Sequence, residues 1–244
     1  MDHRNVVFFV SSYPLRHAVS QCYTYHMRQI EFAQGEFYHV YNHAIEGVNL
    51  IRDATDSERF IEGLLKFNAE EPIGSIYLAR FEKVEADKKL KAKPLVNIVC
   101  YCLNPNHFHL MLEEVAENGI QKFMHRLTMG HCKYMNAKYK RKGVLFQGNF
   151  RAKLLDDNDY LLHTSAYINL NDRVHQLRHA VSQLVRSSWE EYINPRLYGI
   201  CKRDIVLDQF RPRREYEAFA LDALELMLEA KEDQTELKEL EFED

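Results

Sequence analysis

Glycine and proline are scarce in this chain, whose 244 residues include nine Gly and six Pro. This scarcity excludes a collagen-like or low-complexity protein. No apolar run approaches the roughly 18 residues that a membrane-spanning helix needs, so we expect no integral membrane protein. The five cysteines form no Cys-x-x-Cys pair, which predicts a reduced, cytoplasmic protein without a disulfide framework or a zinc ribbon. A glycine-rich loop that could cradle phosphates is also missing, so we expect no nucleotide cofactor.

Charge is distributed unevenly along the chain. The formal net charge is −4, but residues 231–244 hold seven acids and two lysines, a net of −5, which leaves +1 on the other 230 residues. Basic residues gather at 138–142 (KYKRK), at Arg151 and Lys153, and at 211–214. The body is therefore locally basic, whereas the tail is acidic. Such a tail is typical of a solvated helix end, and autoinhibition of a basic groove is the alternative.

Alternating and helical patterns predict an α+β fold. We expect strands at 37–47, 95–103, 107–115 and 144–155, and helices at 58–68, 119–139 and 160–170. Asp56-Ser57 is the expected cap of the first helix and residues 156–159 that of the last, while 83–93 is expected to be a loop or irregular hairpin. The order β-α-β-β-α-β is the ferredoxin-like (RRM-like) split βαβ arrangement, with an antiparallel sheet that leaves one face free. Apolar spacing within 200–244 predicts additional C-terminal helices.

The most informative segment is NPNHFHL, residues 104–110. Asn-Pro-Asn is typical of a turn, and on the strand that follows it His107 and His109 point to one face, roughly 7 Å apart, while Phe108 points to the core. Two imidazoles held by a rigid strand suit a divalent metal ion. An isolated His-x-His is more often a solvated pair on an exposed sheet face, so this motif alone decides nothing.

Four motifs follow one another in the chain: YHVYNHA (38–44), YCLNPNHFHLML (101–112), GVLFQGNFRAKLL (143–155) and DYLLHTSAYINLN (159–171). Together they resemble the Y1 transposases of the IS200/IS605 type, which are HUH endonucleases, and in particular the REP-associated tyrosine transposase branch. WEEYI (189–193) is similar to the trailing Trp-x-x-Tyr segment of that branch. The resemblance implies an N-terminal extension of unknown role (1–26), a transposase domain (27–195) and a helical extension with an acidic tail (196–244).

The resemblance implies roles for four residues. His107 and His109 match the metal-binding pair, Tyr167 matches the catalytic tyrosine, and Asn171 matches a third, amide-bearing metal ligand. The spacing of Tyr167 and Asn171 agrees with this, because residues four apart share one face of a helix. Two neutral imidazoles and one amide oxygen tolerate Mg²⁺ or Mn²⁺ and leave positions open for phosphate oxygens and water.

The activity implied is that of a metal-dependent endonuclease and strand transferase acting on single-stranded DNA. Tyr167 attacks the scissile phosphate to give a 5′-phosphotyrosine and a free 3′-OH, and a different 3′-OH then attacks the ester. The expected DNA is an imperfect hairpin at a palindromic repeat, which agrees with a cytoplasmic, nucleoid-associated protein. Aromatic residues on the free sheet face are expected to stack on bases. The expected DNA contacts are Lys138, Lys140, Arg141, Gln147, Asn149, Arg151 and Lys153.

Two other functions stay open: a domesticated nucleic-acid-binding module that no longer cleaves, and a metal phosphohydrolase that uses water as its nucleophile. Either a monomer or a dimer is compatible with the sequence.

Asp172 is expected to be an unfavourable cap at the C-terminal end of the helix that carries Tyr167, or to lie near the metal. The chain departs from the family pattern at Asn42-His43-Ala44 (for Asn-Arg-Gly), Asn149 (for Arg), Asn169 (for His) and Asp172 (for Pro).

Overall fold

The computed structural model describes residues 30–73, 76, 93–175, 183–194, 196–197 and 199–241. Residues 1–26 and all but the last residue of the lysine-rich stretch 83–93 lie outside these ranges. The chain divides into a body, Gln29–Leu224, and a second unit that holds both chain ends, of which the described part is the end of a helix. Within the described ranges, no helix is both long and apolar enough to cross a membrane.

The body is built on a five-stranded sheet with the strand order β4-β1-β3-β2-β5. Every pairing in it is antiparallel. The first four strands have the order expected of the ferredoxin-like split βαβ arrangement, so the predicted α+β fold is confirmed. The strands are β1 (Phe37–His43), β2 (Val96–Leu103), β3 (His107–Glu114), β4 (Arg151–Leu154) and β5 (Arg186–Ser187).

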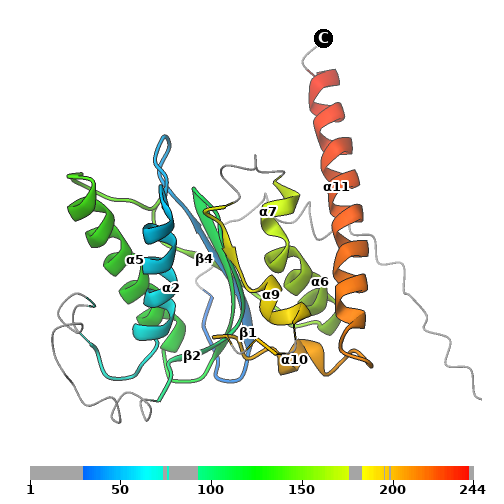
Figure 1. Ribbon diagram of the computed structural model, residues 1–244, viewed down its shortest axis with the longest axis horizontal. Coiled ribbons are helices and arrows are strands. Elements are labelled where there is room, and N and C mark those ends of the chain that lie inside the picture. The colour runs from blue at the N-terminus through cyan, green and yellow to red at the C-terminus, as the bar shows by residue number, and fades with distance from the viewer. Residues whose placement is uncertain are drawn as a thin grey trace, which may run out of the picture. The chain divides into compact units, whose positions relative to one another are not determined.

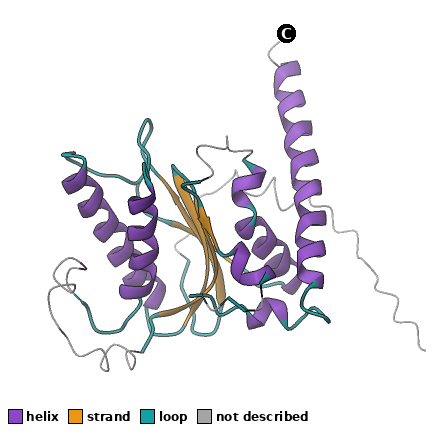
Figure 2. Cartoon of the chain, in the orientation of Figure 1, coloured by secondary structure: helices purple, strands orange, loops and turns teal. Residues whose placement is uncertain are grey.

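Helices cover both faces of the sheet (Figures 1 and 2). On one face, α2 (Ala54–Lys66) and α5 (Gly119–Lys138) enclose the main core, which includes Phe60, Phe108 and Phe123. On the other face lie α6 (Asn158–Asn169), α7 (Asn171–Val174) and α9 (Trp189–Ile193). The expectation of a free sheet face for base stacking is therefore wrong, because the apolar side of α6 packs on β2 and β3.

The remaining helices follow α9 in the chain. They are α10 (Asp204–Leu207), which contacts α6, and α11 (Glu215–Glu241), whose first residues up to Leu224 belong to the body. The buried Tyr216 near the start of α11 packs against Tyr192 of α9, with 5.0 Å between the ring centroids. The sequence-based prediction of helices after residue 200 is confirmed.

Several predicted element boundaries are wrong: β1 ends at His43 rather than at residue 47, and the starts of α2 and β4 also differ. Helix α2 is capped by Asp53 rather than by Asp56-Ser57: the Asp53 side chain accepts from the backbone N–H of Asp56, and the Asp56 side chain accepts from that of Asp53 in return. Strand β4 begins at Arg151 instead of 144, because the chain turns at Gly148, whose φ of +73° suits glycine. Residues before this turn make only an isolated bridge between Phe146 and the end of β1.

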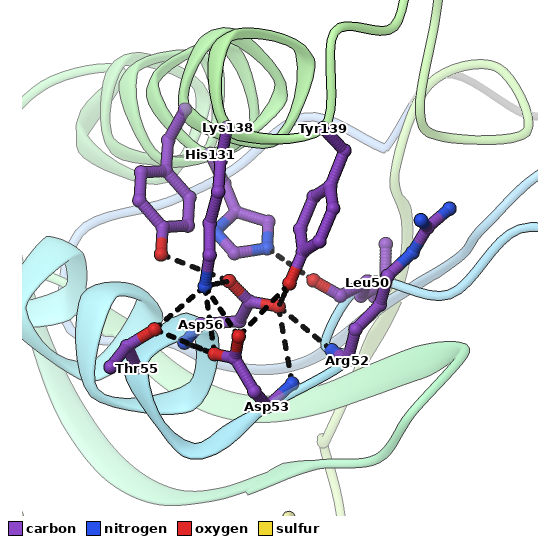
Figure 3. Close-up of polar contacts among 9 residues, drawn as sticks. Leu50, Arg52, Asp53, Thr55, Asp56, His131, Lys138 and Tyr139 are labelled. Atoms are coloured by element: carbon purple, nitrogen blue, oxygen red, sulfur yellow. Dashed lines mark hydrogen bonds and ion pairs between the residues drawn. The ribbon is translucent and has the colours of Figure 1, made fainter.

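A cluster of charged and phenolic groups joins the start of α2 to the end of α5 (Figure 3). The Lys138 ammonium donates to Asp53 Oδ2 and Asp56 Oδ1, both at 2.7 Å. The fully buried Asp56 carboxylate also accepts from the hydroxyls of Tyr139 at 2.7 Å and Tyr134 at 2.9 Å. Burial alone raises the pKa of Asp56, but the hydrogen bonds from Lys138 and Tyr139 outweigh it and lower that pKa. These bonds fix the two helices of the core against each other.

Gly119, the first residue of α5, is placed where a side chain does not fit. A Cβ atom at this position would lie 2.1 Å from the carbonyl oxygen of Leu95, a backbone atom that cannot rotate away. We expect Gly119→Ala to lower the free energy of unfolding by about 2–3 kcal/mol, measured by urea titration, because helix and strand must move apart. The control is Gly63→Ala in α2, whose Cβ would lie 3.0 Å from a flexible Leu127 methyl group and at ordinary contact distance, 3.5 Å or more, from the Phe67 ring. Equal losses in the two variants would contradict this explanation.

Candidate active site

The four residues predicted for the active site come together on the sheet face that α6 and α7 cover. His107 and His109 lie on β3, and both are buried. The ring of Tyr167, on α6, lies edge-on to that of His109, with 5.4 Å between the ring centroids. Asn171, the first residue of α7, places its Oδ1 atom 3.0 Å from Nε2 of His107. The structure thus puts a phenol, two imidazoles and an amide oxygen side by side.

The hydrogen bonds of His107 determine which of its nitrogens carries the proton. Its Nδ1 lies 2.8 Å from Oδ1 of Asn106, as that amide is oriented here. Since an amide oxygen only accepts, Nδ1 is the donor and Nε2 keeps a lone pair. Burial lowers the pKa of His107 to about 4, so the ring is neutral near pH 7. Its Nε2 atom therefore has a lone pair, which here accepts from Nδ2 of Asn104.

Two acceptor atoms face each other between β3 and α7. Nε2 of His107 and Oδ1 of Asn171 are 3.0 Å apart, and neither carries a proton. The Nδ2 group of Asn104 donates to both atoms, at 2.9 and 2.6 Å respectively. Nδ2 of Asn171 is buried without a hydrogen-bond partner among the described residues. In this structure the Asn104 amide supplies the hydrogen atoms for both lone pairs, and a cation bound to the two atoms would replace these hydrogen bonds.

This set of donor atoms fits a divalent metal ion. Nε2 of His107 on β3 and Oδ1 of Asn171 on α7, two lone-pair atoms 3.0 Å apart, would hold such an ion from two elements. Burial also lowers the pKa of His109 well below its ordinary value, so its ring is neutral as well. In the parts of the chain that are described, no three His, Cys, Asp or Glu side chains form a group that could hold a metal ion. The third protein ligand would then be the amide oxygen of Asn171, as the sequence predicts.

Strand β1 adds three side chains of the motif YHVYNHA to the site, to which the sequence analysis assigns no role there: His39, Tyr41 and His43. In the strand register, Tyr41 lies opposite His109 and His43 lies opposite His107. The corresponding ring centroids are 5.7 and 5.1 Å apart, and both pairs are stacked. The one signal for them in the sequence is their spacing of two residues, which any strand with one polar face also has.

Helix α6 ends earlier than expected, and this changes the surroundings of Asn171. Leu170 caps α6, and the chain begins another helical turn, α7, at Asn171. Asp172 therefore lies in the first turn of α7, and the unfavourable interaction expected at a helix C-terminus does not arise. His175, just after α7, brings its ring to 4.9 Å from that of His107. It is a further histidine of the site that no motif indicates.

A buried hydrogen-bond network joins the C-terminal end of α6 to strand β2 and to helix α11. Nδ2 of Asn169 donates to the hydroxyl of Tyr216 at 2.8 Å, and the hydroxyl of Ser188 donates to Oδ1 of Asn169 at 2.6 Å. The backbone N–H of Tyr101 on β2 donates to the Ser188 hydroxyl at 2.9 Å. Asn169, which stands where the family pattern has histidine, thus links α6 to β2 and α11. The network fixes the helix that carries the predicted nucleophile.

Two of the residues predicted to contact DNA, Arg151 and Lys153, lie beside the site. In the register of β4 against β1, Arg151 lies opposite Tyr41 and Lys153 opposite His39, so their side chains share the face of the two site residues. Arg151 is exposed, and Nζ of Lys153 lies 4.3 Å from the centre of the Tyr160 ring. The strand pairing therefore puts two cations at one edge of the site.

The other predicted DNA contacts lie in two different places. Gln147 and Asn149 are exposed in the loop before β4, which is held to the end of β1 by a bond of 2.8 Å from Gln147 N to His43 O. Lys138, Lys140 and Arg141 lie at the end of α5, the helix on the opposite face of the sheet. Lys138 already bonds two carboxylates, and Arg141 donates to Asn136 Oδ1 at 3.3 Å.

Comparisons with known proteins agree with the motifs of the sequence. Residues 84–171 match the family model described as transposase, IS200 like. A solved structure of a REP-associated tyrosine transposase bound to a REP hairpin is similar, with 13% identity and a TM-score of 0.44, covering 72% of this chain and 90% of that one. No curated protein is significantly similar in sequence. The family match spans the predicted histidine pair, the tyrosine and Asn171, and over these residues the chain is similar to the IS200-like transposases.

Proposed function

We propose that this protein is a metal-dependent endonuclease and strand transferase for single-stranded DNA, with Tyr167 as its nucleophile. The observation that carries the proposal is the position of the Tyr167 ring against His109, on the sheet face where His107 meets Asn171. The Tyr167 side chain is half-buried beside two imidazoles that burial keeps neutral. The IS200-like family match over the same residues supports this function.

The metal ligands in this proposal are Nε2 of His107, Nε2 of His109 and Oδ1 of Asn171. A bound Mg²⁺ or Mn²⁺ ion would offset the negative charge that develops on the phosphate as it is attacked. The three side chains are held by the protein before DNA arrives: two on β3, and one at the start of α7. Because β3 lies between two other strands and all three side chains are buried, the ligands need little rearrangement.

Tyr167 forms and breaks the covalent bond in this reaction. Its phenol oxygen attacks the phosphorus atom, the bond from phosphorus to the 3′ oxygen breaks, and the 3′ oxygen leaves as a hydroxyl. The phenol must lose its proton on the way, because a phenol with an ordinary pKa near 10 is a weak nucleophile. A second 3′-OH then attacks the phosphotyrosine and releases Tyr167, so strands are exchanged without ATP.

The proposed substrate is a DNA hairpin at a palindromic repeat with single-stranded flanks. In this proposal, Arg151 and Lys153 would neutralise phosphates at the edge of the site, and Gln147 and Asn149 would contact bases from their exposed loop. Lys140 and Arg141 would contact the DNA further from the site. We leave Lys138 out of the proposed contacts, because its ammonium is paired with Asp53 and Asp56.

A covalent-adduct assay tests this function. The protein is mixed with single-stranded hairpins labelled at the 3′ end, because a 5′-phosphotyrosine retains the 3′ fragment. We expect a labelled band at the mass of protein plus fragment with Mn²⁺, and none with EDTA or with His107→Ala. His125→Ala, which removes an exposed histidine from α5, is the matched control and should keep the band.

The other outcomes of this assay separate the alternative functions. Cleavage without a covalent band would assign the reaction to a metal phosphohydrolase. Binding without cleavage, across hairpins that include genomic repeats, would indicate a nucleic-acid-binding module and contradict the proposal.

A further inference from the structure

His39 makes a direct contact with a predicted metal ligand, and nothing in the motifs assigns it a role. Its Nε2 lies 2.8 Å from Nδ1 of His109. The two rings are stacked, with 5.1 Å between centroids, and both side chains are buried. Lys153 on β4 and Tyr167 on α6 flank the pair from the neighbouring elements. A contact between two ring nitrogens this short contains one proton.

The position of that proton decides what His109 can bind. If Nε2 of His39 carries it, then Nδ1 of His109 accepts, the proton of the neutral His109 ring lies on Nε2, and that atom cannot bind a metal ion. If Nδ1 of His109 carries it, then Nε2 of His109 keeps its lone pair. The neighbouring His107 is already in this second form, since its Nδ1 donates to Asn106.

We propose that His39 is a positioning residue that accepts the hydrogen bond from Nδ1 of His109 and so presents Nε2 of His109 to the divalent metal ion. This inference rests on the proposed function, because it presupposes a metal ion at His107, His109 and Asn171. Metal-binding histidines usually donate their second nitrogen to an oxygen acceptor, which fixes the ring and its tautomer. Asn106 fulfils this role for His107, and the imidazole of His39 fulfils it for His109.

His39 is not itself a ligand in this arrangement. The nitrogen that faces the site, Nε2, is used by His109. In the residues that the structure describes, no group of three His, Cys, Asp or Glu side chains could hold a metal ion, so a set of His39, His107 and His109 is not formed. The role left to His39 is to hold the ring of His109 and to fix its proton.

Mn²⁺ binding to the full chain without DNA tests this role independently of activity. Free Mn²⁺ is counted by electron paramagnetic resonance during titration of the wild type, His39→Phe, His39→Gln and His107→Ala. We expect His39→Phe to weaken binding by about 10–100-fold, the usual effect of losing such a partner. His39→Gln should retain most of the affinity, because its amide oxygen can accept at the place of Nε2. His131→Phe is the matched control, since His131 is buried under the other sheet face, where it bonds Leu50 O at 2.7 Å.

The outcomes separate this inference from the proposed function. If the wild type does not bind Mn²⁺, or if His107→Ala binds as well as the wild type, the proposed metal site itself is wrong. If His107→Ala loses affinity while His39→Phe keeps it, only the role of His39 is overturned. Nitrogen NMR of histidine-labelled wild type gives a second readout that needs no variant. Protonation of His109 on Nδ1 is the expected result, and protonation on Nε2 would overturn the inference.

Discussion

Replacement of Tyr167 by phenylalanine is expected to abolish the covalent protein–DNA adduct and to slow strand cleavage by about 10⁴-fold or more. The variant loses only the hydroxyl that forms the bond to phosphorus. The ring itself, which lies edge-on to His39 and His109, is retained, so the fold and the neighbouring imidazoles should be undisturbed. Single-turnover cleavage of a 3′-labelled hairpin, with the adduct resolved on a denaturing gel, measures both effects.

Tyr160→Phe is the matched control for this experiment. Tyr160 lies on the same helix two turns before Tyr167, and its ring is covered by the ammonium of Lys153. We expect this variant to form the adduct, because removal of its hydroxyl leaves the ring in place under the cation. If the adduct persists in Tyr167→Phe and disappears in Tyr160→Phe, the nucleophile has been assigned to the wrong tyrosine.

The largest expected effect on stability is that of Asp56→Ala, a loss of about 3 kcal/mol in the free energy of unfolding. Asp56 is fully buried and accepts hydrogen bonds from Lys138, Tyr139 and Tyr134, besides the backbone N–H of Arg52 at 2.8 Å (Figure 3). Its removal takes the acceptor from the Tyr134 hydroxyl and the Arg52 N–H, and leaves Lys138 and Tyr139 only their bonds to Asp53 and, for Lys138, Thr55. Urea unfolding at neutral pH measures the loss.

Asp53→Ala provides the comparison. Because Asp53 caps the same helix from a half-exposed position, its replacement should lower the free energy of unfolding by only about 1 kcal/mol.

The contribution of Asp56 to the free energy of unfolding should depend on pH in a defined direction. The pKa of Asp56 in the folded protein is below the ordinary 3.8, so its contribution is present at neutral pH and is lost as the pH falls from about 3.8 through the folded value. The gap between wild type and Asp56→Ala should therefore narrow on acidification. A gap that does not depend on pH would contradict the ionic role.

The sheet and its two core helices are predictable because local patterns determine them. Alternation in 37–43, 96–103 and 107–114 places apolar residues such as Phe108 toward α2 and α5, and the strand order follows from the order of elements. Long-range contacts are not encoded in such patterns. The pairing of Lys138 with Asp53 and Asp56 joins residues more than 80 positions apart, and the sequence shows Lys138 only as part of a basic run.

The predicted site is only partly determined by local spacing. The pair His107 and His109 follows from the geometry of a strand, but the approach of Asn171 to His107 depends on how α6 ends and α7 begins. His39 and His175 reach the same site from other elements, and each looks like an ordinary histidine in the sequence. The covering of the second sheet face by α6 and α9 also depends on tertiary packing, which is why a free face was expected instead.

Strand β1 limits which sequence changes this protein can accept during evolution. Its odd-numbered positions 39, 41 and 43 supply the site, while Tyr38 and Val40 between them are buried in the main core. An insertion or deletion of one residue within the strand would exchange the two sets, turning imidazoles into the core and apolar groups toward the site. A substitution changes one side chain at a time, whereas a change in length displaces all of them at once. Among relatives of this chain, β1 should therefore be constant in length.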